Sequence, residues 1–491
     1  MTAEELLRQP LCLGGDLGKP MPSSEHAVSM ALPNWEHVVG YEEQRPEVVS
    51  RLACGYPRFV IHRLVGELSR RICRSNNALV FPSVRTAQRA LDFVRRRARG
   101  SGELVDGEIL SGVRVTEEGW ESLKLFWQHT GQIVSTRQAA FYLGDPGLGG
   151  SREALVELRG LLAEFYGCSS EDVFLTPTGM AAQDIALRVL RRRMPGRPTV
   201  QLGFPYVDTL KLQQRFGDGA ELLHHLDSLE TELRRVFQRG AVAGAFCEIP
   251  GNPLLGSADL RRISPILRAA GAPLVADDVV ATPWNVDLSG YADLVATSLT
   301  KYVVGTGDAM GGAVICNPKS PYYRELRRLV DEEHEELLWP ADAAVILDRA
   351  KSFPERMRRH NANGLTIAER LRRHPGVERV WYPKWEFPEV YEAVRKPEGG
   401  WGSLVTFMPK DAARRSPLIY DALEVCKGPS LGTVFTLACP FTLLAHYTEL
   451  EWAEACGVSR YLIRLSVGLE DVDELWGRIV RALDAATHRE C

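Results

Sequence analysis

Two stretches of sequence decide the fold: Ala272-Pro273-Leu274-Val275-Ala276-Asp277, and Ser298-Leu299-Thr300-Lys301-Tyr302 further along the chain. The first is a short apolar run bounded by turn residues, and so is Asp293–Thr297, directly before the second; both are predicted to be strands. Val242–Glu248 is predicted to be a third strand, and the intervening Leu260–Ala270 a helix. This alternation predicts α/β layers around a largely parallel sheet.

Polar residues follow the ends of these predicted strands. Asn252 comes soon after the strand at Val242–Glu248, Asp277 ends the next strand, and Lys301 follows the third. In an open parallel sheet, ligands bind beyond the carboxyl ends of the strands. We therefore expect the three side chains to meet in one crevice.

The stretch Val173–Ala182 predicts a further strand that leads through a turn of small residues into a long helix. Free amides in the first turn of a helix attract anions, and a glycine there lets the anion approach the backbone. A Thr-Gly turn before a helix is by itself an ordinary cap. Its position in the same sheet favours a phosphate site at Gly179 and Met180.

Lys301 and Asp277 together suggest pyridoxal phosphate (PLP) chemistry. A lysine that condenses with an aldehyde must be partly desolvated so that its amine is uncharged, and nearby hydroxyls can hold a phosphate. Ser298 and Thr300 supply such hydroxyls. An aspartate at the preceding strand end can keep the pyridine nitrogen protonated, which makes the ring an electron sink. Ser-x-x-Lys also occurs in penicillin-binding enzymes, but their Ser-Asp-Asn and Lys-Thr-Gly strings are missing from this sequence.

Composition narrows the remaining classes. A length of 491 residues predicts two or three domains, and a hydrophobic content of 45% is typical of soluble globular proteins. A formal net charge of -4 gives no overall attraction to nucleic acid or anionic membranes, and no apolar run approaches the roughly 18 residues of a spanning helix. The ten cysteines form no Cys-x-x-Cys pair, the eleven histidines show no zinc spacing, and acidic Glu4 and Glu5 stand where a leader would be basic. We expect a cytoplasmic protein with no metal, nucleic-acid or membrane partner.

Three regions are predicted along the chain. Residues 1–140 hold an extended arm at Pro10–Pro33, an arginine-rich stretch and a predicted loop at Gly100–Gly107. Residues 141–320 are expected to form the PLP-binding domain. Residues 321–491 are expected to form a smaller C-terminal domain that begins with helices and has strands at Gly402–Phe407 and Tyr461–Val467.

Seven motifs follow one another in order between about Tyr56 and Leu483: Gly55-Tyr56-Pro57-Arg58, Thr178-Gly179-Met180-Ala181-Ala182, Glu248-Ile249-Pro250-Gly251-Asn252-Pro253-Leu254, Val275-Ala276-Asp277-Asp278, Thr297-Ser298-Leu299-Thr300-Lys301-Tyr302, Ser430-Leu431-Gly432 and Ile463-Arg464-Leu465-Ser466-Val467-Gly468-Leu469-Glu470. Together they resemble the Cys/Met-metabolism family of PLP-dependent trans-sulfuration enzymes. The stretches His26–Pro33 and Val39–Glu43 look most like its fungal-type cystathionine γ-synthases. The resemblance implies PLP fold type I, which is aspartate-aminotransferase-like, with a large parallel-sheet cofactor domain and a smaller C-terminal α/β domain.

The resemblance also implies roles for the matching residues. Lys301 would be the Schiff-base lysine and general base, Asp277 the partner of the pyridine nitrogen, and Tyr206 the tyrosine that stacks on the ring and assists proton transfer. Four residues would hold the phosphate: Gly179, Met180, Ser298 and Thr300.

Two further groups of residues complete the implied site. Tyr56 and Arg58 would reach the phosphate of a neighbouring subunit, so that a homodimer or homotetramer would share its active sites. Arg464 would bind the substrate carboxylate as a guanidinium fork, helped by Asn252 and Ser430.

The activity implied by the resemblance is γ-replacement on an O-acyl-L-homoserine-type amino acid with a thiol nucleophile such as cysteine. A carbon nucleophile in a specialised biosynthesis, or attack by water as in a γ-lyase, remains an alternative. Three departures from the family pattern bear on the substrate. Phe59-Val60-Ile61-His62 replaces the usual Asn-Pro-Thr, Asp278 stands where asparagine is usual, and Gly305-Thr306-Gly307-Asp308 replaces Gly-His-Ser-Asp.

Two other classes compete with this interpretation. Gly428-Pro429-Ser430-Leu431-Gly432 fits the Gly-x-Ser-x-Gly elbow of α/β-hydrolases, with Asp471 and His488 downstream in the expected order. An elbow needs a buried strand directly before it, and Glu424–Pro429 is of mixed composition and contains proline. A non-catalytic relative is disfavoured because the lysine, the aspartate and both arginines are all retained.

Overall fold

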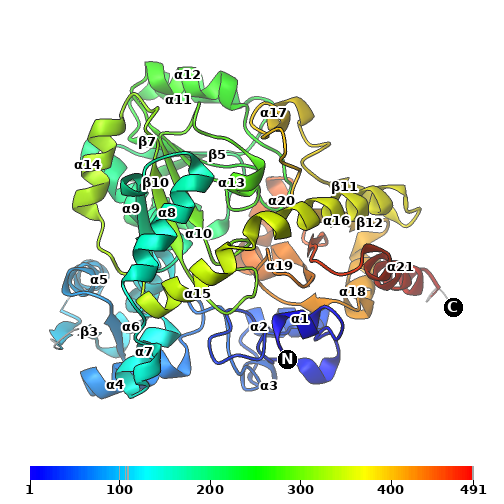
Figure 1. Cartoon of the computed structure of the whole chain (residues 1–491), viewed down its shortest axis with the longest axis horizontal. Helices are drawn as coiled ribbons and strands as arrows, with labels where there is room; N and C mark the ends of the chain where they lie inside the picture. Colours follow the sequence, from blue (N-terminus) through cyan, green and yellow to red (C-terminus); the bar gives the residue numbers. More distant parts are fainter. Residues whose placement is uncertain (99, 106, 108–109, 489–491) are drawn as a thin grey trace.

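A seven-stranded sheet forms the centre of the computed structural model, which describes residues 1–98, 100–105, 107 and 110–488 (Figure 1). The strand order is β4-β10-β9-β8-β7-β5-β6, and β10 alone runs antiparallel to its neighbours. The predicted largely parallel sheet is confirmed. The elements of this part are α8 (Glu153–Tyr166), β4 (Val173–Thr176), α9 (Gly179–Arg193), β5 (Thr199–Leu202), α10 (Val207–Phe216), β6 (Ala220–Leu223), α11 (Leu229–Arg239), β7 (Gly244–Glu248), α12 (Leu260–Ala269), β8 (Leu274–Asp277), α13 (Thr282–Asn285), β9 (Leu294–Ser298), β10 (Gly312–Cys316) and α14 (Tyr323–Glu333).

Helices cover both faces of this sheet. Successive side chains of a strand point to opposite faces. In β7, Ala245 and Cys247 pack into the cluster that contains residues of α8 and α12, whereas Phe246 packs with residues of α9 and α14. Burial on both faces explains why the strands read as continuous apolar runs.

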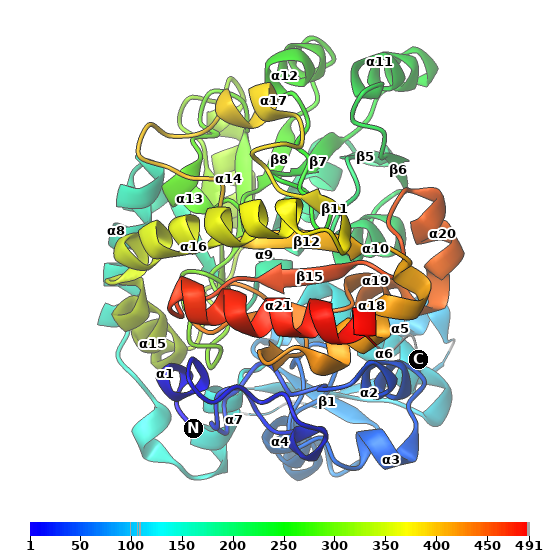
Figure 2. The same ribbon diagram turned by 90° about the vertical axis from the view of Figure 1, so that its right-hand side faces the viewer.

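A second sheet of five strands, in the order β11-β12-β15-β14-β13, lies in the C-terminal part. Figure 2 shows the long helices α16 and α21 running across it. The predicted strands Gly402–Phe407 and Tyr461–Val467 correspond to β12 and β15. The elements of this part are α15 (Pro340–Ala350), α16 (Phe353–Arg373), β11 (Val377–Trp381), α17 (Pro388–Glu392), β12 (Leu404–Pro409), α18 (Ala412–Ala422), β13 (Cys426–Lys427), β14 (Leu437–Cys439), α19 (Phe441–His446), α20 (Leu450–Ala455), β15 (Ile463–Ser466) and α21 (Val472–His488).

The helices expected at the start of the C-terminal domain pack elsewhere. Leu326 and Leu329 of α14, and Ile346 of α15, belong to the cores of the large sheet. Within α16, Phe353 packs with that large-sheet core and Ile367 with the core of the second sheet. We therefore propose that the change from one domain to the other lies inside α16, downstream of residue 321.

The N-terminal arm lies along the C-terminal domain, below the orange and red segments in Figure 1. Its short helices are α1 (Ala3–Leu6), α2 (Trp35–Glu42) and α3 (Pro46–Val49). Met30, Leu32 and Trp35 enter the core of the second sheet, and Lys427 Nζ donates to Pro33 O at 2.8 Å. The arm is thus anchored to its own chain.

The arginine-rich stretch forms a small domain of its own, which we call the N-terminal domain. It contains an antiparallel sheet in the order β1-β3-β2 and a separate hydrophobic core. The loop predicted at Gly100–Gly107 is wrong in part, because Glu103–Val105 pairs with β3 as an edge strand. The elements are α4 (Arg63–Cys73), β1 (Ala78–Phe81), α5 (Val84–Arg97), β2 (Glu103–Val105), β3 (Ser111–Arg114), α6 (Glu117–Thr130) and α7 (Thr136–Leu143).

The N-terminal domain is fastened to the large-sheet domain. The Phe93 and Phe216 rings stack with centroids 4.4 Å apart, and buried Arg137 donates to Asp342 Oδ1 at 2.9 Å. Among the described residues, no helix has the length and apolar character needed to cross a membrane.

Candidate active site

A cavity of about 170 Å³ opens at the carboxyl ends of β7, β8 and β9. Glu248 and Asp277 are register partners at the last paired positions of β7 and β8, so both carboxyl groups come to this edge. Eleven of the twelve residues predicted from sequence line the cavity: Tyr56, Arg58, Gly179, Met180, Tyr206, Asn252, Asp277, Ser298, Lys301, Ser430 and Arg464.

Lys301 lies in the wall of the cavity and is largely buried. Its Nζ donates to Ser430 Oγ at 3.0 Å and to Tyr56 Oη at 3.4 Å, and lies 4.6 Å from the centre of the Tyr56 ring. Burial lowers the pKa of Lys301, and Tyr56 opposes this shift without reversing it; the positive charges of Arg58 and Arg464 act in the same direction as burial. The site therefore favours the uncharged amine, which is the nucleophilic form.

Asp277 faces the cavity from the end of β8. Its carboxylate accepts from the Val279 amide and from Gln183 Nε2, each at 2.9 Å. Burial raises the pKa of Asp277 to about 7, and the neighbouring Asp278 contributes in the same direction. No lysine, arginine or histidine pairs with it in the described part of the chain. A carboxylate held in this way is suited to a cationic ring nitrogen.

The N-terminus of α9 forms another side of the cavity. Thr178 caps the helix by accepting from the Ala181 amide at 3.1 Å. A Cβ on Gly179 would come within 2.5 Å of the Ser298 Cβ, so only glycine allows this close approach. The resulting pocket of backbone amides beside a serine hydroxyl fits a phosphate group.

Thr300 is the exception among the predicted residues. Its hydroxyl accepts from the Gly311 amide at 3.2 Å and donates to the Gly311 carbonyl at 3.3 Å, and the side chain does not line the cavity. The prediction of a direct phosphate contact is not supported by this geometry. Thr300 instead fixes the turn that presents Lys301, because it ties the turn to the strand start at β10.

Arg58 is held by acceptors of its own chain. Its guanidinium donates to Asp208 Oδ2 and Gln128 O, both at 2.6 Å, and to Tyr206 Oη at 2.7 Å. Burial alone would raise the pKa of Asp208, but the Arg58 charge holds it well below its usual value. This buried ion pair fixes the segment around Tyr56 and Arg58 over the cavity.

The resemblance predicted that Tyr56 and Arg58 serve a neighbouring subunit, and this sharing of sites between subunits stays a prediction. Both residues line the cavity of their own chain. The cause is the anchoring of the chain on either side: Cys54 packs in the core of the second sheet, and Leu64 in the N-terminal domain. Trp127 of α6 also donates to Pro57 O at 3.1 Å. The segment therefore has fixed ends on its own chain.

The opposite end of the cavity is arranged around Arg464. Its Nη1 donates to Asn252 Oδ1 at 3.2 Å and its Nη2 to Ser430 O at 2.7 Å. Its Nε is buried and has no hydrogen-bond partner among the described residues. A buried donor without a partner costs free energy, so this position is suited to an anionic group such as a carboxylate.

Of the three departures from the family pattern, one reaches the cavity. Phe59 lines it, whereas Asp278 faces away and accepts from Tyr166 Oη at 3.0 Å. Residues 305–308 are not in the lining. Phe59 is therefore the departure that can touch a substrate.

Three residues of the site were not predicted from the sequence: Gln183, Asp208 and His129. Gln183 holds Asp277, and it lies four residues after Gly179, so helical spacing placed it on the cavity face of α9. Asp208 follows Tyr206 by two residues and accepts a hydrogen bond from Arg58. His129 lies 3.2 Å from Asp208 but belongs to α6, and no sequence signal connected them.

The hydrolase elbow is not formed. A two-residue strand, β13, does precede it, contrary to expectation, but residues 428–440 contain no helix and the next helix begins at Phe441. Ser430 accepts from Lys301, and the side chain of His488 lies outside the described residues. Within the described ranges, no group of three His, Cys, Asp or Glu side chains is placed to hold a metal ion.

We expect Asp277→Asn to lower PLP-dependent turnover by roughly a thousandfold. An amide carries no charge to pair with a cationic ring nitrogen, and such a pair at 4 Å is worth about 4 kcal/mol at an effective dielectric near 20. Asp278→Asn is the matched control, because Asp278 is also a buried carboxyl but faces Tyr166. Steady-state kinetics showing equal losses in the two variants would contradict the assignment of Asp277.

Asp277 should also give the cofactor-free protein a pH-dependent stability. Its pKa rises from 3.8 unfolded to about 7 folded, so between pH 4 and 7 the native state keeps a proton that the unfolded chain has lost. The free energy of unfolding therefore falls with rising pH across this window, by at most about 4 kcal/mol. Urea unfolding at pH 5 and pH 8 measures this difference in the free energy of unfolding. The difference should be smaller in cofactor-free Asp277→Asn than in the wild type; an equal difference in both would refute the role given to Asp277.

Mixing two inactive variants should distinguish own-chain from shared sites. Lys301→Ala and Arg58→Lys, unfolded together and refolded as a mixture, should recover no turnover beyond the average of the two, because every chain lacks one part of its own site. Sites shared across a dimer would instead restore about a quarter of the wild-type turnover. Lys at position 58 keeps the charge opposite Asp208, and melting curves check that both variants fold.

Comparisons with known proteins identify the family of this chain. The model of the Cys/Met metabolism PLP-dependent enzyme family matches residues 156–484, and the model of the N-terminal domain of fungal trans-sulfuration enzymes matches residues 60–135. The cystathionine γ-synthase of Neurospora crassa is 33% identical, covering 96% of this chain and 98% of its own. An L-2-amino-4-chloropent-4-enoate dechlorinase/desaturase of Streptantibioticus cattleyicolor is 32% identical, covering 95% of this chain and 98% of its own.

A solved structure shows the same fold. The cystathionine γ-synthase of Xanthomonas oryzae pv. oryzae, in complex with cystathionine, superposes with a TM-score of 0.61 at 26% identity, covering 72% of this chain and 88% of its own. The predicted fold class, PLP fold type I with a large parallel-rich sheet and a further sheet domain, is confirmed. The chain belongs to the Cys/Met metabolism family of PLP-dependent enzymes and carries the N-terminal domain of the fungal trans-sulfuration type.

Proposed function

We propose that this protein catalyses γ-replacement on an O-acyl-L-homoserine-type amino acid with a thiol such as cysteine. The observation that carries the proposal is a largely buried lysine amine between an unpaired carboxylate, Asp277, and a guanidinium with a free donor, Arg464. The cavity thus has separate places for an amino-acid carboxylate, for the reacting amine and for the cofactor. Relatives named cystathionine γ-synthase that match along nearly the whole chain support the reaction class.

Each residue has a physical task in this reaction. Arg464 binds the substrate carboxylate through its unpaired Nε and so orients the α-carbon toward Lys301. The uncharged Nζ of Lys301 takes the α-proton. PLP, when bound at Asp277 and the start of α9, takes up the electron pair that this proton leaves behind.

Tyr56 is the better candidate for moving protons beside the lysine. Burial would raise the pKa of Tyr56, but the charges of Lys301 and Arg58 lower it overall. The pKa of Tyr206 is raised, chiefly by burial, so Tyr206 keeps its proton. We therefore propose that Tyr56 Oη exchanges protons with Lys301 Nζ, and that Tyr206 positions the cofactor ring. Lys301 Nζ would next take a proton from the β-carbon, and the electron pair left there would expel the acyloxy group from the γ-carbon, assisted by a proton from Tyr56 Oη.

Elimination is the second candidate. The Streptantibioticus relative is named for a dechlorination and desaturation, and it is about as similar to this chain as the synthases are. Phe59, at the mouth of the cavity, stands where the family pattern has a different residue. An acceptor other than cysteine, including a carbon nucleophile, fits the same lysine chemistry.

The assembly and the cellular location of the protein stay predictions. We propose that the partners are small amino-acid substrates and a second copy of the chain, as a homodimer or homotetramer. Tyr56 and Arg58 line the cavity of their own chain, so we propose that the second copy does not supply them. We also propose a cytoplasmic location, which the absence of a Cys-x-x-Cys pair in the sequence supports.

A product assay tests the proposed activity. Incubation with O-acetyl- or O-succinyl-L-homoserine plus cysteine should give cystathionine, identified by mass, and Lys301→Ala should give none. Omitting cysteine should remove the product. If 2-oxobutanoate forms equally with and without cysteine, the enzyme is a γ-lyase and the replacement proposal is wrong.

A further inference from the structure

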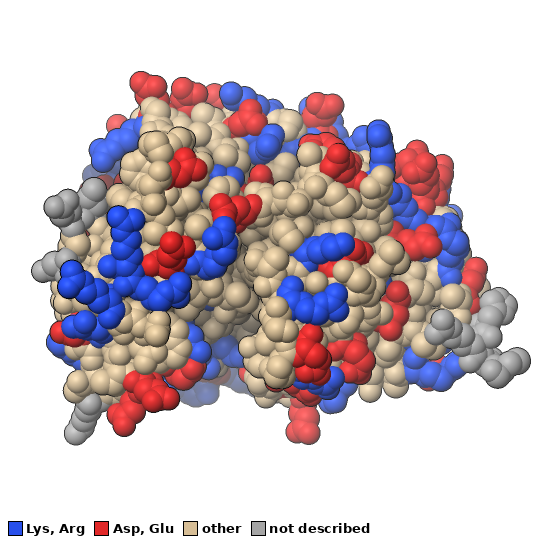
Figure 3. Space-filling model, turned by 90° about the horizontal axis from the view of Figure 1, so that it is seen from below, with Lys and Arg blue, Asp and Glu red and all other residues tan. Residues whose placement is uncertain are grey.

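A second cavity, of about 390 Å³, lies where the N-terminal domain meets the large-sheet domain. Residues of α5, α6, α9 and α10 form its walls. Only two acidic residues line it, Asp92 and Asp184, against six arginines: Arg89, Arg96, Arg97, Arg188, Arg191 and Arg215. Figure 3 shows Lys and Arg side chains gathered on the left of the lower face, the side on which Figure 1 places the N-terminal domain.

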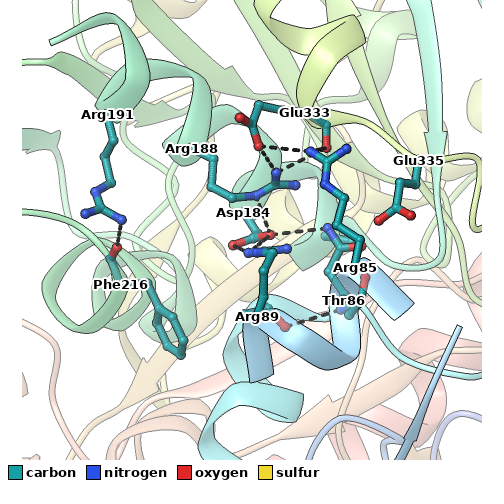
Figure 4. Close-up of polar contacts among 12 residues, drawn as sticks. Arg85, Thr86, Arg89, Asp184, Arg188, Arg191, Phe216, Glu333 and Glu335 are labelled. Carbon is teal, nitrogen blue, oxygen red and sulfur yellow. Dashed lines mark hydrogen bonds and ion pairs between the residues drawn. The ribbon is translucent and has the colours of Figure 1, made fainter. Parts of the chain in front are cut away.

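The inner end of the cavity is already neutralised. Asp184 is buried and accepts from Arg89 at 2.9 Å and from Arg188 at 3.1 Å (Figure 4). It also accepts from Gln132 at 3.2 Å. Burial would raise the pKa of Asp184, but the two guanidinium groups lower it overall, so it stays ionised. Arg188 also pairs with Glu333 of α14. Arg89 thus joins the N-terminal domain to α9, whereas the ion pairs of Arg188 stay within the large-sheet domain. Neither arginine is free for a ligand.

The outer end is not neutralised. Arg96, Arg97 and Arg215 have no carboxylate partner among the described residues, and all three side chains are exposed. Arg96 and Arg97 come from α5 of the N-terminal domain, whereas Arg215 comes from α10 of the large-sheet domain. Like charges on the two sides of a domain junction repel each other. An anion placed between them would remove this repulsion.

We propose that this cavity binds a small phosphorylated anion with at least two negative charges, and that the anion clamps the N-terminal domain onto the large-sheet domain. Guanidinium groups present donors in a planar fork that matches phosphate oxygens, and arginine is preferred at such sites. The stacked Phe93 and Phe216 rings give the cavity a rigid wall. A nucleic acid is disfavoured, because the chain as a whole is negatively charged and the arginines surround a cavity.

The same cavity is connected to the active site. Arg215 Nη1 lies 3.0 Å from His129 Nε2, and since a guanidinium can only donate, that ring nitrogen accepts. The proton of the neutral ring is then on Nδ1, which lies 3.2 Å from Asp208 Oδ1 without hydrogen-bond geometry. Asp208 in turn holds Arg58 over the active-site cavity. An anion that draws Arg215 away from His129 therefore alters the support of Arg58.

Titration calorimetry on the holoenzyme tests the proposal. The PLP-loaded protein is used because its own phosphate site is then filled, and pyrophosphate is the probe, at low ionic strength. We expect one site per chain and an affinity that falls about tenfold or more in the double variant Arg96→Ala/Arg97→Ala. The matched control is Arg70→Ala/Arg71→Ala, which removes two exposed charges from α4 of the same domain, away from the cavity.

Each outcome bears on the proposal. No binding, or equal weakening in the two double variants, would overturn it, the latter because attraction by net charge alone would then suffice. Equal affinity for citrate would overturn the preference for phosphate. Arg96 and Arg97 lie outside the active site, so the first double variant should keep its basal turnover.

Two further readouts test the clamp and the connection. Pyrophosphate should raise the melting temperature of the holoenzyme and protect residues 60–135 from hydrogen exchange, in the wild type but not in Arg96→Ala/Arg97→Ala. It should also change the wild-type KM by at least about twofold, with no change in that variant. Unaltered hydrogen exchange would refute the clamp, and an unaltered KM would refute the connection to Arg58.

Discussion

The parallel register of β7, β8 and β9 is the constraint on which the rest of the molecule depends. Pairing sets Glu248 opposite Asp277, and Val275 opposite Leu294, so three consecutive strands end at one edge of the sheet. Lys301 follows the third end, and the capped start of α9 closes the same space. A one-residue slip in this register would turn the carboxyl groups to the other face. The chemistry proposed for the cavity is therefore a consequence of strand alignment.

The second determinant is a buried ion pair outside the sheet edge. Arg58 and Asp208 join the segment that crosses the cavity to helix α10. The arm before this segment packs on the C-terminal domain, and the N-terminal domain follows it. Through these contacts, Tyr56 and Arg58 line the cavity of their own chain. The arginine-lined cavity is connected to the active site through His129, which lies between Arg215 and Asp208.

Sequence patterns predicted the centre of the molecule well and its periphery poorly. Short apolar runs bounded by turn residues identified β7, β8 and β9, because strands buried on both faces are almost entirely apolar except at their ends. The edge strand β2 has a half-exposed, mixed sequence, and only its pairing with β3 reveals it. The helices α14 and α15 are amphipathic like any surface helix, so sequence could not tell which sheet they cover. The residues of the site divide in the same way. Those within motifs were predicted from the sequence, whereas Asp208 and His129 join the site only through tertiary contacts.

The chemistry proposed for this protein depends most directly on the amine of Lys301 being the group that carries the cofactor. Reduction of the PLP-loaded protein with borohydride, followed by proteolysis and mass mapping, tests this in one measurement. We expect a single modified peptide, with the reduced adduct on Lys301 and none in Lys301→Ala. An adduct on another lysine, or a PLP-saturated wild-type protein that yields none, would contradict the account.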